Sequence, residues 1–223
     1  MLKSYNKLDL LIALYIFCIV TSELMGAKTI PIGDLGFMKL NASVSIFLLP
    51  LIFSINDVIT EVYGVSKARS LVRIGIMIVA LLFVFAAFAV ALPPSSRFKE
   101  AEPAYNAVFG QSIRISFASL IAFGISDICD VLIFTKLRAR FKDKALWLRN
   151  NTSNIVAQLI DTVIFMTLAF YALDKSVADN WTFLLSVILP YWTVKSCMSI
   201  IETPLVYLGV RWLRKPNASA QTH

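Results

Sequence analysis

An apolar stretch runs from Ile74 to Ser96 without a single charged residue. A helix needs about 20 apolar residues to cross the hydrocarbon core of a bilayer, and this stretch is long enough. Composition extends the conclusion to the whole chain, because 58% of its 223 residues are hydrophobic and 16% are charged. An ordinary globular protein has roughly 25% charged residues. We therefore expect a membrane protein, and we exclude a secreted disulfide scaffold, a disordered tail and a nucleic-acid-binding domain.

Five further apolar segments accompany this one, and each is interrupted by an ionisable residue. The sequence predicts an all-α, polytopic membrane protein, with six transmembrane helices in one bundle and a single domain over residues 1–223. The expected spans are 8–26, 42–62, 71–92, 113–134, 153–173 and 184–208. We expect the first to be retained as a span rather than cleaved as a signal peptide. Three prolines, Pro50, Pro190 and Pro204, lie within these spans, where proline can kink a helix.

The net charge of +7 is explained by where the basic residues lie. With the amino terminus inside, most of the 21 lysines and arginines fall in segments that face the cytoplasm, most densely between Lys136 and Arg149. This bias is what the positive-inside rule expects. We therefore predict that both termini are cytoplasmic and that the basic residues face the lipid bilayer, with no nucleic-acid partner.

The sequence predicts no cofactor and no metal. Cys18, Cys129 and Cys197 fall on different expected spans, and the single histidine is His223. This pattern fits neither a disulfide framework nor a metal-ligand set. The sequence has no phosphate-binding or dinucleotide-binding glycine motif, so energy from ATP would have to come from another subunit.

Polar residues within the spans are the candidate functional residues. An ionisable side chain at mid-bilayer costs roughly 2.5–3.5 kcal/mol and needs a partner or a cavity. These residues recur at helical spacing, so those of one span share a face. They are Glu23; Asn56, Asp57, Thr60 and Glu61; Ser126, Asp127 and Asp130; Asn154, Gln158 and Asp161; and Lys195, Ser199 and Glu202. Because such faces cannot point at lipid, we expect them to converge on a hydrated pocket inside the bundle.

Several of these residues also have a purely structural interpretation. Asp57 and Glu61 lie near the cytoplasmic end of their span, where their carboxylates could extend to water. Asp127 and Asp130 approach the basic inner loop and could pair with it. Lys195 could form a structural ion pair with one carboxylate. Asp161 lies near mid-span, and its structural interpretation is the weakest.

Two separated motifs resemble the queuosine precursor transporter family, in the vitamin uptake transporter group. The first runs from Asn56 to Gly64 as NDVITEVYG. The second begins at Trp147 with WLRNNTS and continues from Gln158 as QLIDTVIF. In addition, the block that starts at Asp130, DVLIF, matches the end of the family's fourth span. The resemblance covers most of the chain, from about residue 20 to residue 208.

The resemblance implies a multi-pass transporter of the bacterial inner membrane rather than an enzyme. It implies import of precursors of the tRNA base queuosine, namely 7-cyano-7-deazaguanine, 7-aminomethyl-7-deazaguanine or both, by alternating access. In such a ligand, N1–H and the 2-amino group are adjacent donors, which one carboxylate can accept together. Its flat ring favours aromatic faces, and Phe53, Phe134, Phe165 and Trp192 lie near the polar residues.

We therefore predict a substrate site in which Asp161 or Glu61 binds the guanine edge and Lys195 balances charge. Amide side chains would orient the ligand. The predicted substrate-binding residues are Asn56, Asp57, Glu61, Asp130, Asn154, Gln158, Asp161 and Lys195.

Two other functions compete with a stand-alone secondary carrier. One is a substrate-binding subunit of an ATP-driven vitamin-type uptake complex, and the other is an intramembrane enzyme whose paired aspartates do acid–base work. No catalytic motif is recognisable, and carboxylates three or four residues apart on one helix are more typical of a binding face. We favour the carrier, without ATP-driven partner subunits. The sequence leaves open a homo-oligomer, the coupling ion and the preferred 7-deazaguanine.

Overall fold

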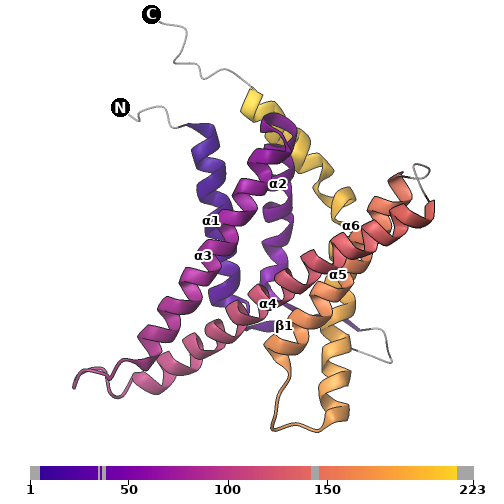
Figure 1. Cartoon of the computed structure of the whole chain (residues 1–223). Helices are drawn as coiled ribbons and strands as arrows, with labels where there is room; N and C mark the ends of the chain where they lie inside the picture. The colour runs from indigo at the N-terminus through magenta and orange to yellow at the C-terminus, as the bar shows by residue number, and fades with distance from the viewer. Residues whose placement is uncertain (1–5, 35, 37–38, 142–145, 215–223) are drawn as a thin grey trace, which may run out of the picture.

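A computed structural model describes the backbone of residues 6–34, 36, 39–141 and 146–214. It describes their side chains except those of residues 130–131, 134–135, 137–154 and 198–203. The chain folds into long helices that run alternately up and down in Figure 1. They are α1 (Lys7–Met25), α2 (Leu49–Tyr63), α3 (Val65–Ala91), α4 (Glu102–Phe141), α5 (Leu146–Phe170) and α6 (Val177–Arg214). Each overlaps one expected apolar segment, and the mostly helical fold is confirmed.

The membrane character of the chain rests on the length and apolar composition of its helices. Within the described residues, four segments are long and apolar enough to cross a membrane: Lys7–Met25, Val44–Tyr63, Val65–Ala91 and Glu102–Cys129. The apolar part of α5, Ile155–Phe170, is shorter. These four segments are candidate membrane spans, while the full set of six spans stays a prediction.

A β-hairpin follows α1, and the all-α prediction did not include it. Strand β1 (Thr29–Asp34) pairs antiparallel with β2 (Lys39–Ser43). Gly36 in the turn has a φ of +80°, which favours glycine, and its N–H donates to the Asp34 carboxylate over 2.8 Å. Pairing of the strands satisfies the backbone groups that face each other across the hairpin.

The hairpin also changes where the second helix begins. A short 3₁₀ helix, η1 (Val44–Phe47), follows β2, so α2 begins at Leu49 rather than near residue 42. Pro50 therefore lies in the first turn of α2, where its missing N–H costs no helical hydrogen bond, and the expected kink does not apply there. Pro190 and Pro204 do lie inside α6.

Hydrogen bonds join the hairpin to α1 and α6. The Ser43 hydroxyl donates to the Gly26 carbonyl over 2.6 Å, and the Tyr191 hydroxyl donates to the Ser43 carbonyl over 3.2 Å. The Asn41 amide donates to the Ser186 hydroxyl over 2.9 Å. These bonds fix the hairpin across the lower half of the bundle in Figure 1.

At the other end of the molecule, the start of α1 meets the end of α6. The Lys7 ammonium donates to the Trp212 carbonyl over 2.9 Å. Below this contact, α1, α2 and α3 share an apolar core that includes Ile59 and Leu71. A second core joins the hairpin, α5 and α6 around Met166.

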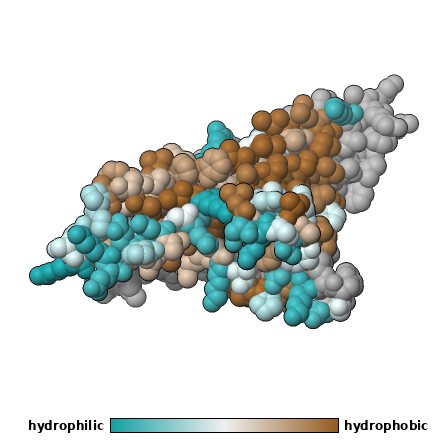
Figure 2. Space-filling view, turned by 90° about the horizontal axis from the view of Figure 1, so that it is seen from below, coloured by the Kyte–Doolittle hydropathy of each residue, from teal (hydrophilic) through white to brown (hydrophobic). Residues whose placement is uncertain are grey.

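Large apolar side chains also cover the outside of the bundle. Phe85 and Phe88 on α3 are 68% and 58% exposed, as expected of residues that face lipid. Seen from below in Figure 2, polar residues gather over the loop ends, and apolar residues cover much of the flank. This distribution matches a bundle whose sides, rather than its ends, contact hydrocarbon.

Close packing of α1 on α3 depends on Gly75. A Cβ at this position would lie 2.8 Å from Ile19 Cδ1 and 3.2 Å from Tyr15 Cε1. We expect Gly75→Ala to lower the free energy of unfolding by about 1–3 kcal/mol, because these side chains must shift. Gly110→Ala is the matched control, since a Cβ there meets nothing within 4 Å. Thermal unfolding in detergent measures the stability of both variants. Equal stability of the two would contradict the close packing of α1 on α3 at Gly75.

Candidate functional site

A cavity of about 280 Å³ lies in the interior, where the six helices converge. Every helix contributes to its wall, for example Leu49 from α2 and Val72 from α3. Its polar lining residues are Tyr15, Ser22, Glu23, Ser43, Ser45, Ser119, Asp161, Tyr191 and Lys195. The remaining lining is apolar, so the wall combines hydrophobic surface with a few polar groups, as small-molecule sites do.

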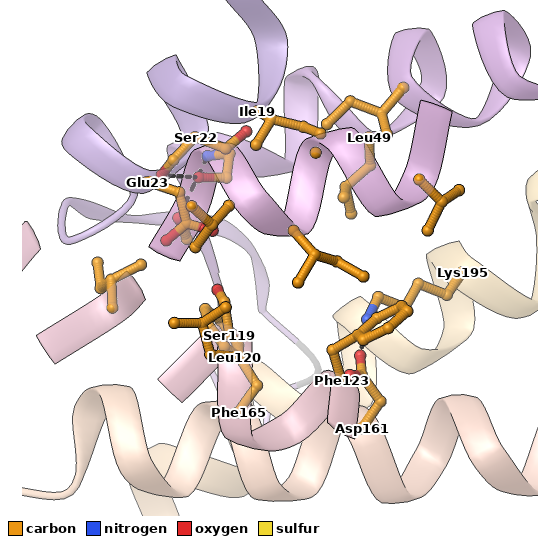
Figure 3. Close-up of a pocket in the computed structure, with 18 of the residues that line it drawn as sticks. Ile19, Ser22, Glu23, Leu49, Ser119, Leu120, Phe123, Asp161, Phe165 and Lys195 are labelled. Carbon is orange, nitrogen blue, oxygen red and sulfur yellow. Dashed lines mark hydrogen bonds and ion pairs between the residues drawn. The ribbon is translucent and has the colours of Figure 1, made fainter. Parts of the chain in front are cut away.

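An ion pair between α5 and α6 forms one side of the cavity. Lys195 Nζ lies 2.6 Å from Asp161 Oδ2, and the two side chains are only 15% and 24% exposed. Figure 3 shows both side chains at the cavity, joined across the two helices. At this distance the pair is a charge-assisted hydrogen bond, which neutralises the net charge on this side.

Glu23 from α1 forms the opposite side of the cavity in Figure 3. Its side chain is only 7% exposed, and Ser116 and Ser119 of α4 lie beside its carboxylate. Nevertheless, Oε2 of Glu23 has no hydrogen-bond partner among the described residues. The Ser112 hydroxyl donates to the Leu24 carbonyl over 3.0 Å and so holds α4 against α1 at this level.

Serines from the hairpin region complete the wall between these sides. Ser43 and Ser45 both line the cavity, and the Ser45 hydroxyl donates to the Ser22 carbonyl over 3.0 Å. The hairpin therefore bounds the cavity at one end, and the Tyr191 hydroxyl bond to Ser43 keeps it against α6.

Aromatic rings make up part of the lining. Tyr15, Phe123, Phe165 and Tyr191 come from α1, α4, α5 and α6. Such rings provide faces against which a flat ligand can stack. Of the aromatic residues predicted from sequence, Phe165 lines this cavity and Phe53 and Trp192 do not, while the side chain of Phe134 lies outside the described residues.

The structure brings together some predicted site residues and separates others. Asp161 and Lys195 line the cavity, whereas Asn56, Asp57, Glu61 and Gln158 are not part of its wall. The side chains of Asp130 and Asn154 lie outside the described residues, so their predicted roles stay predictions.

The four residues outside the wall occupy different environments. Asp57 and Glu61 are exposed on α2, and Glu61 pairs with Arg214 of α6 over 3.4 Å. Asn56 and Gln158 are partly buried, and the side-chain oxygen of each lacks a hydrogen-bond partner within the described part of the chain. Their place in a ligand site stays a prediction.

Glu23 was among the polar residues that we expected to converge on a pocket, but it was not among the predicted substrate-binding residues. The available signal was the same as for Asp161: an ionisable residue in an apolar helix with no basic neighbour at helical spacing. Tyr15 and Ser119 gave no such signal, because tyrosine and serine are common in ordinary helix packing.

The Asp161–Lys195 pair should stabilise the fold in a coupled manner. Asp161→Asn and Lys195→Met should each lower the free energy of unfolding, because each leaves an unpaired charge in the interior. We expect a loss below the roughly 3–5 kcal/mol of a fully buried pair, since both side chains are partly open to the cavity. The double variant should lose less free energy of unfolding than the two single variants lose together. A loss equal to that sum would contradict the coupling.

The exposed Glu61–Arg214 pair provides the control for this cycle. Its side chains are 63% and 60% exposed, so Arg214→Ala should cost no more than about 0–1 kcal/mol after solvent screening. Thermal and denaturant unfolding of the purified variants in detergent gives both sets of values.

Comparison with known proteins now identifies the family. A family model described as "Putative vitamin uptake transporter" matches residues 43–209. A "Probable queuosine precursor transporter" of Bacillus subtilis (strain 168) is 30% identical, over 98% of this chain and 90% of the relative. The "Queuosine precursor transporter" of Escherichia coli (strain K12) is 26% identical, over 80% of this chain and 76% of the relative.

A third relative, a "Probable queuosine precursor transporter" of Haemophilus influenzae, is 26% identical over 69% of this chain and 63% of its own length. No solved structure matches the chain. The family match, the relatives and the apolar helices together support a membrane transporter rather than an enzyme. The chain belongs to the putative vitamin uptake transporter family.

Proposed function

We propose that this protein imports 7-deazaguanine precursors of queuosine across the bacterial inner membrane, with both termini in the cytoplasm. The observation that carries the proposal is the cavity at which six helices converge, with an ion pair and aromatic rings in its wall. Relatives named as queuosine precursor transporters support the ligand class.

The size and lining of the cavity suit one flat heterocycle. Its volume of about 280 Å³ is close to the lower end of the roughly 300–1,000 Å³ typical of small-molecule pockets. A deazaguanine ring can stack on Phe165 or Tyr191, and the apolar lining would displace water from its faces.

The ion pair suits the polar edge of the same ring. Asp161 can accept a hydrogen bond from N1–H or the 2-amino group, and Lys195 can donate to the ring carbonyl. Because the pair is neutral as a whole, it matches an edge that carries donors and an acceptor but no net charge. Asn56, Asp57, Glu61, Asp130, Asn154 and Gln158 remain proposed as residues that orient the ligand in other conformations of the transport cycle.

We propose alternating access as the mechanism, with α6 as a moving element. Lys195 lies between Pro190 and Pro204 inside α6, and each proline removes one helical hydrogen bond from the interior of the helix. A helix weakened on both sides of Lys195 can bend without disturbing its ends. Movement there would separate Lys195 from Asp161 and change access to the ligand.

Transport by the purified protein alone tests the proposed function. Liposomes that contain only this chain should accumulate 7-cyano- or 7-aminomethyl-7-deazaguanine, because a carrier needs no ATP-driven partner. The measurement is uptake of labelled ligand with and without a proton gradient, against protein-free liposomes. Failure with every precursor, with folded protein confirmed, would contradict the proposal; uptake that requires an added ATPase subunit would favour the alternative complex.

Asp161 provides the residue-level test. Asp161→Ala should abolish uptake, because the ring edge loses its acceptor and Lys195 loses its partner, while the protein still inserts in the membrane. Asp174→Ala is the matched control, since the Asp174 side chain is 77% exposed in the loop after α5. Uptake at the wild-type rate in the Asp161 variant would remove that residue from the site.

A further inference from the structure

The two carboxylates of the cavity differ in their partners. Asp161 is neutralised by Lys195 at 2.6 Å. Around Glu23, no lysine or arginine among the described residues lies within ion-pair distance, and Oε2 lacks even a hydrogen-bond donor there. The side chain is nonetheless more than nine-tenths buried and forms part of the cavity wall.

When Glu23 is ionised, this arrangement leaves its negative charge without a positive group to balance it. Ser116 and Ser119 can donate hydrogen bonds to Glu23, but hydroxyl groups carry no positive charge. Glu23 is only 7% exposed, and apolar residues such as Ile19 and Ile115 line the same cavity. An ionisable group in such surroundings is costly unless a partner balances it, and it is therefore a functional-site candidate.

A cation carried by the ligand would balance Glu23. The cavity then has two complementary sides: the neutral Asp161–Lys195 pair for a neutral ring edge, and Glu23 for a positive group on the same ligand. Glu23, Asp161 and Lys195 line the same cavity, and Figure 3 shows Glu23 on the side opposite the ion pair. Charge-assisted hydrogen bonds are shorter and stronger than neutral ones, and they strengthen further as apolar neighbours lower the local dielectric.

We infer that Glu23 is the counter-ion for a protonated amine on the planar ligand and thereby determines specificity for cationic over neutral substituents. This inference rests on the proposed function. An aminomethyl group is protonated at neutral pH and donates three hydrogen bonds, as a lysine side chain does. A nitrile carries no charge and only accepts hydrogen bonds, so it gains nothing from a carboxylate.

Ligand binding to purified protein in nanodiscs tests the inference. The probes are 7-aminomethyl- and 7-cyano-7-deazaguanine, and the dissociation constant of each is measured by calorimetry for wild type and Glu23→Gln. We expect the variant to bind the aminomethyl compound about 10- to 100-fold more weakly, the usual range for loss of a charged hydrogen bond. Its affinity for the nitrile should stay within about threefold of the wild-type value, because no charge is matched there.

Glu100→Gln is the matched control, because Glu100 is exposed in the connection between α3 and α4, outside the cavity. It should leave both affinities unchanged. Equal weakening of both ligands by Glu23→Gln, or no effect on either, would overturn the inference. Failure of wild-type protein to bind both compounds would instead reject the proposed function, and the inference with it.

A second variant covers the case in which Glu23→Gln does not fold. Glu23→Asp keeps the negative charge and shortens the side chain. The Glu23→Asp variant should bind the aminomethyl compound more tightly than a Glu23→Ala variant does. This result would support the counter-ion role. Loss of the preference in the aspartate variant, with the nitrile affinity intact, would overturn it.

Discussion

The interior of this protein depends on one constraint: hydrocarbon offers no partner for a charged side chain. The ion pair between Asp161 and Lys195 satisfies it by joining α5 to α6 over 2.6 Å inside the bundle. Because the two charges must meet, the polar faces of these helices turn inward, and the apolar faces are left for lipid. The two charged side chains then lie in the wall of the cavity.

The hairpin after α1 obeys the same constraint at the level of the backbone. Its strands satisfy one another's N–H and C=O groups, and Ser43 and Tyr191 fasten it to the helices on either side. The hairpin is thereby held against the cavity, with the backbone groups between its two strands paired. The resulting site is asymmetric, with a neutral pair on one side and Glu23 on the other. Such asymmetry favours one orientation of a ligand that has one polar edge and one charged substituent.

Much of the fold could be predicted, because long apolar segments leave a chain few options. Each long helix overlaps an expected segment, and Asp161 and Lys195 were found because each interrupts hydrocarbon near mid-span. Glu61 is likewise a carboxylate within a family motif, yet it lies exposed beside Arg214. Position along a helix cannot separate these cases, because a carboxylate near a helix end can reach water. The hairpin escaped prediction since short strands between spans resemble any loop rich in Gly and Pro.

The sequence by itself determined that this chain is a helical membrane protein of a transporter family, because hydrophobic length and ordered motifs are local properties. Tertiary structure alone decided that Glu23, from the first helix, faces Asp161 and Lys195, from the last two, across one cavity. It also decided which carboxylate has a cation beside it. These outcomes depend on how helices distant in sequence rotate against each other, and residue spacing within one helix carries no information about that rotation.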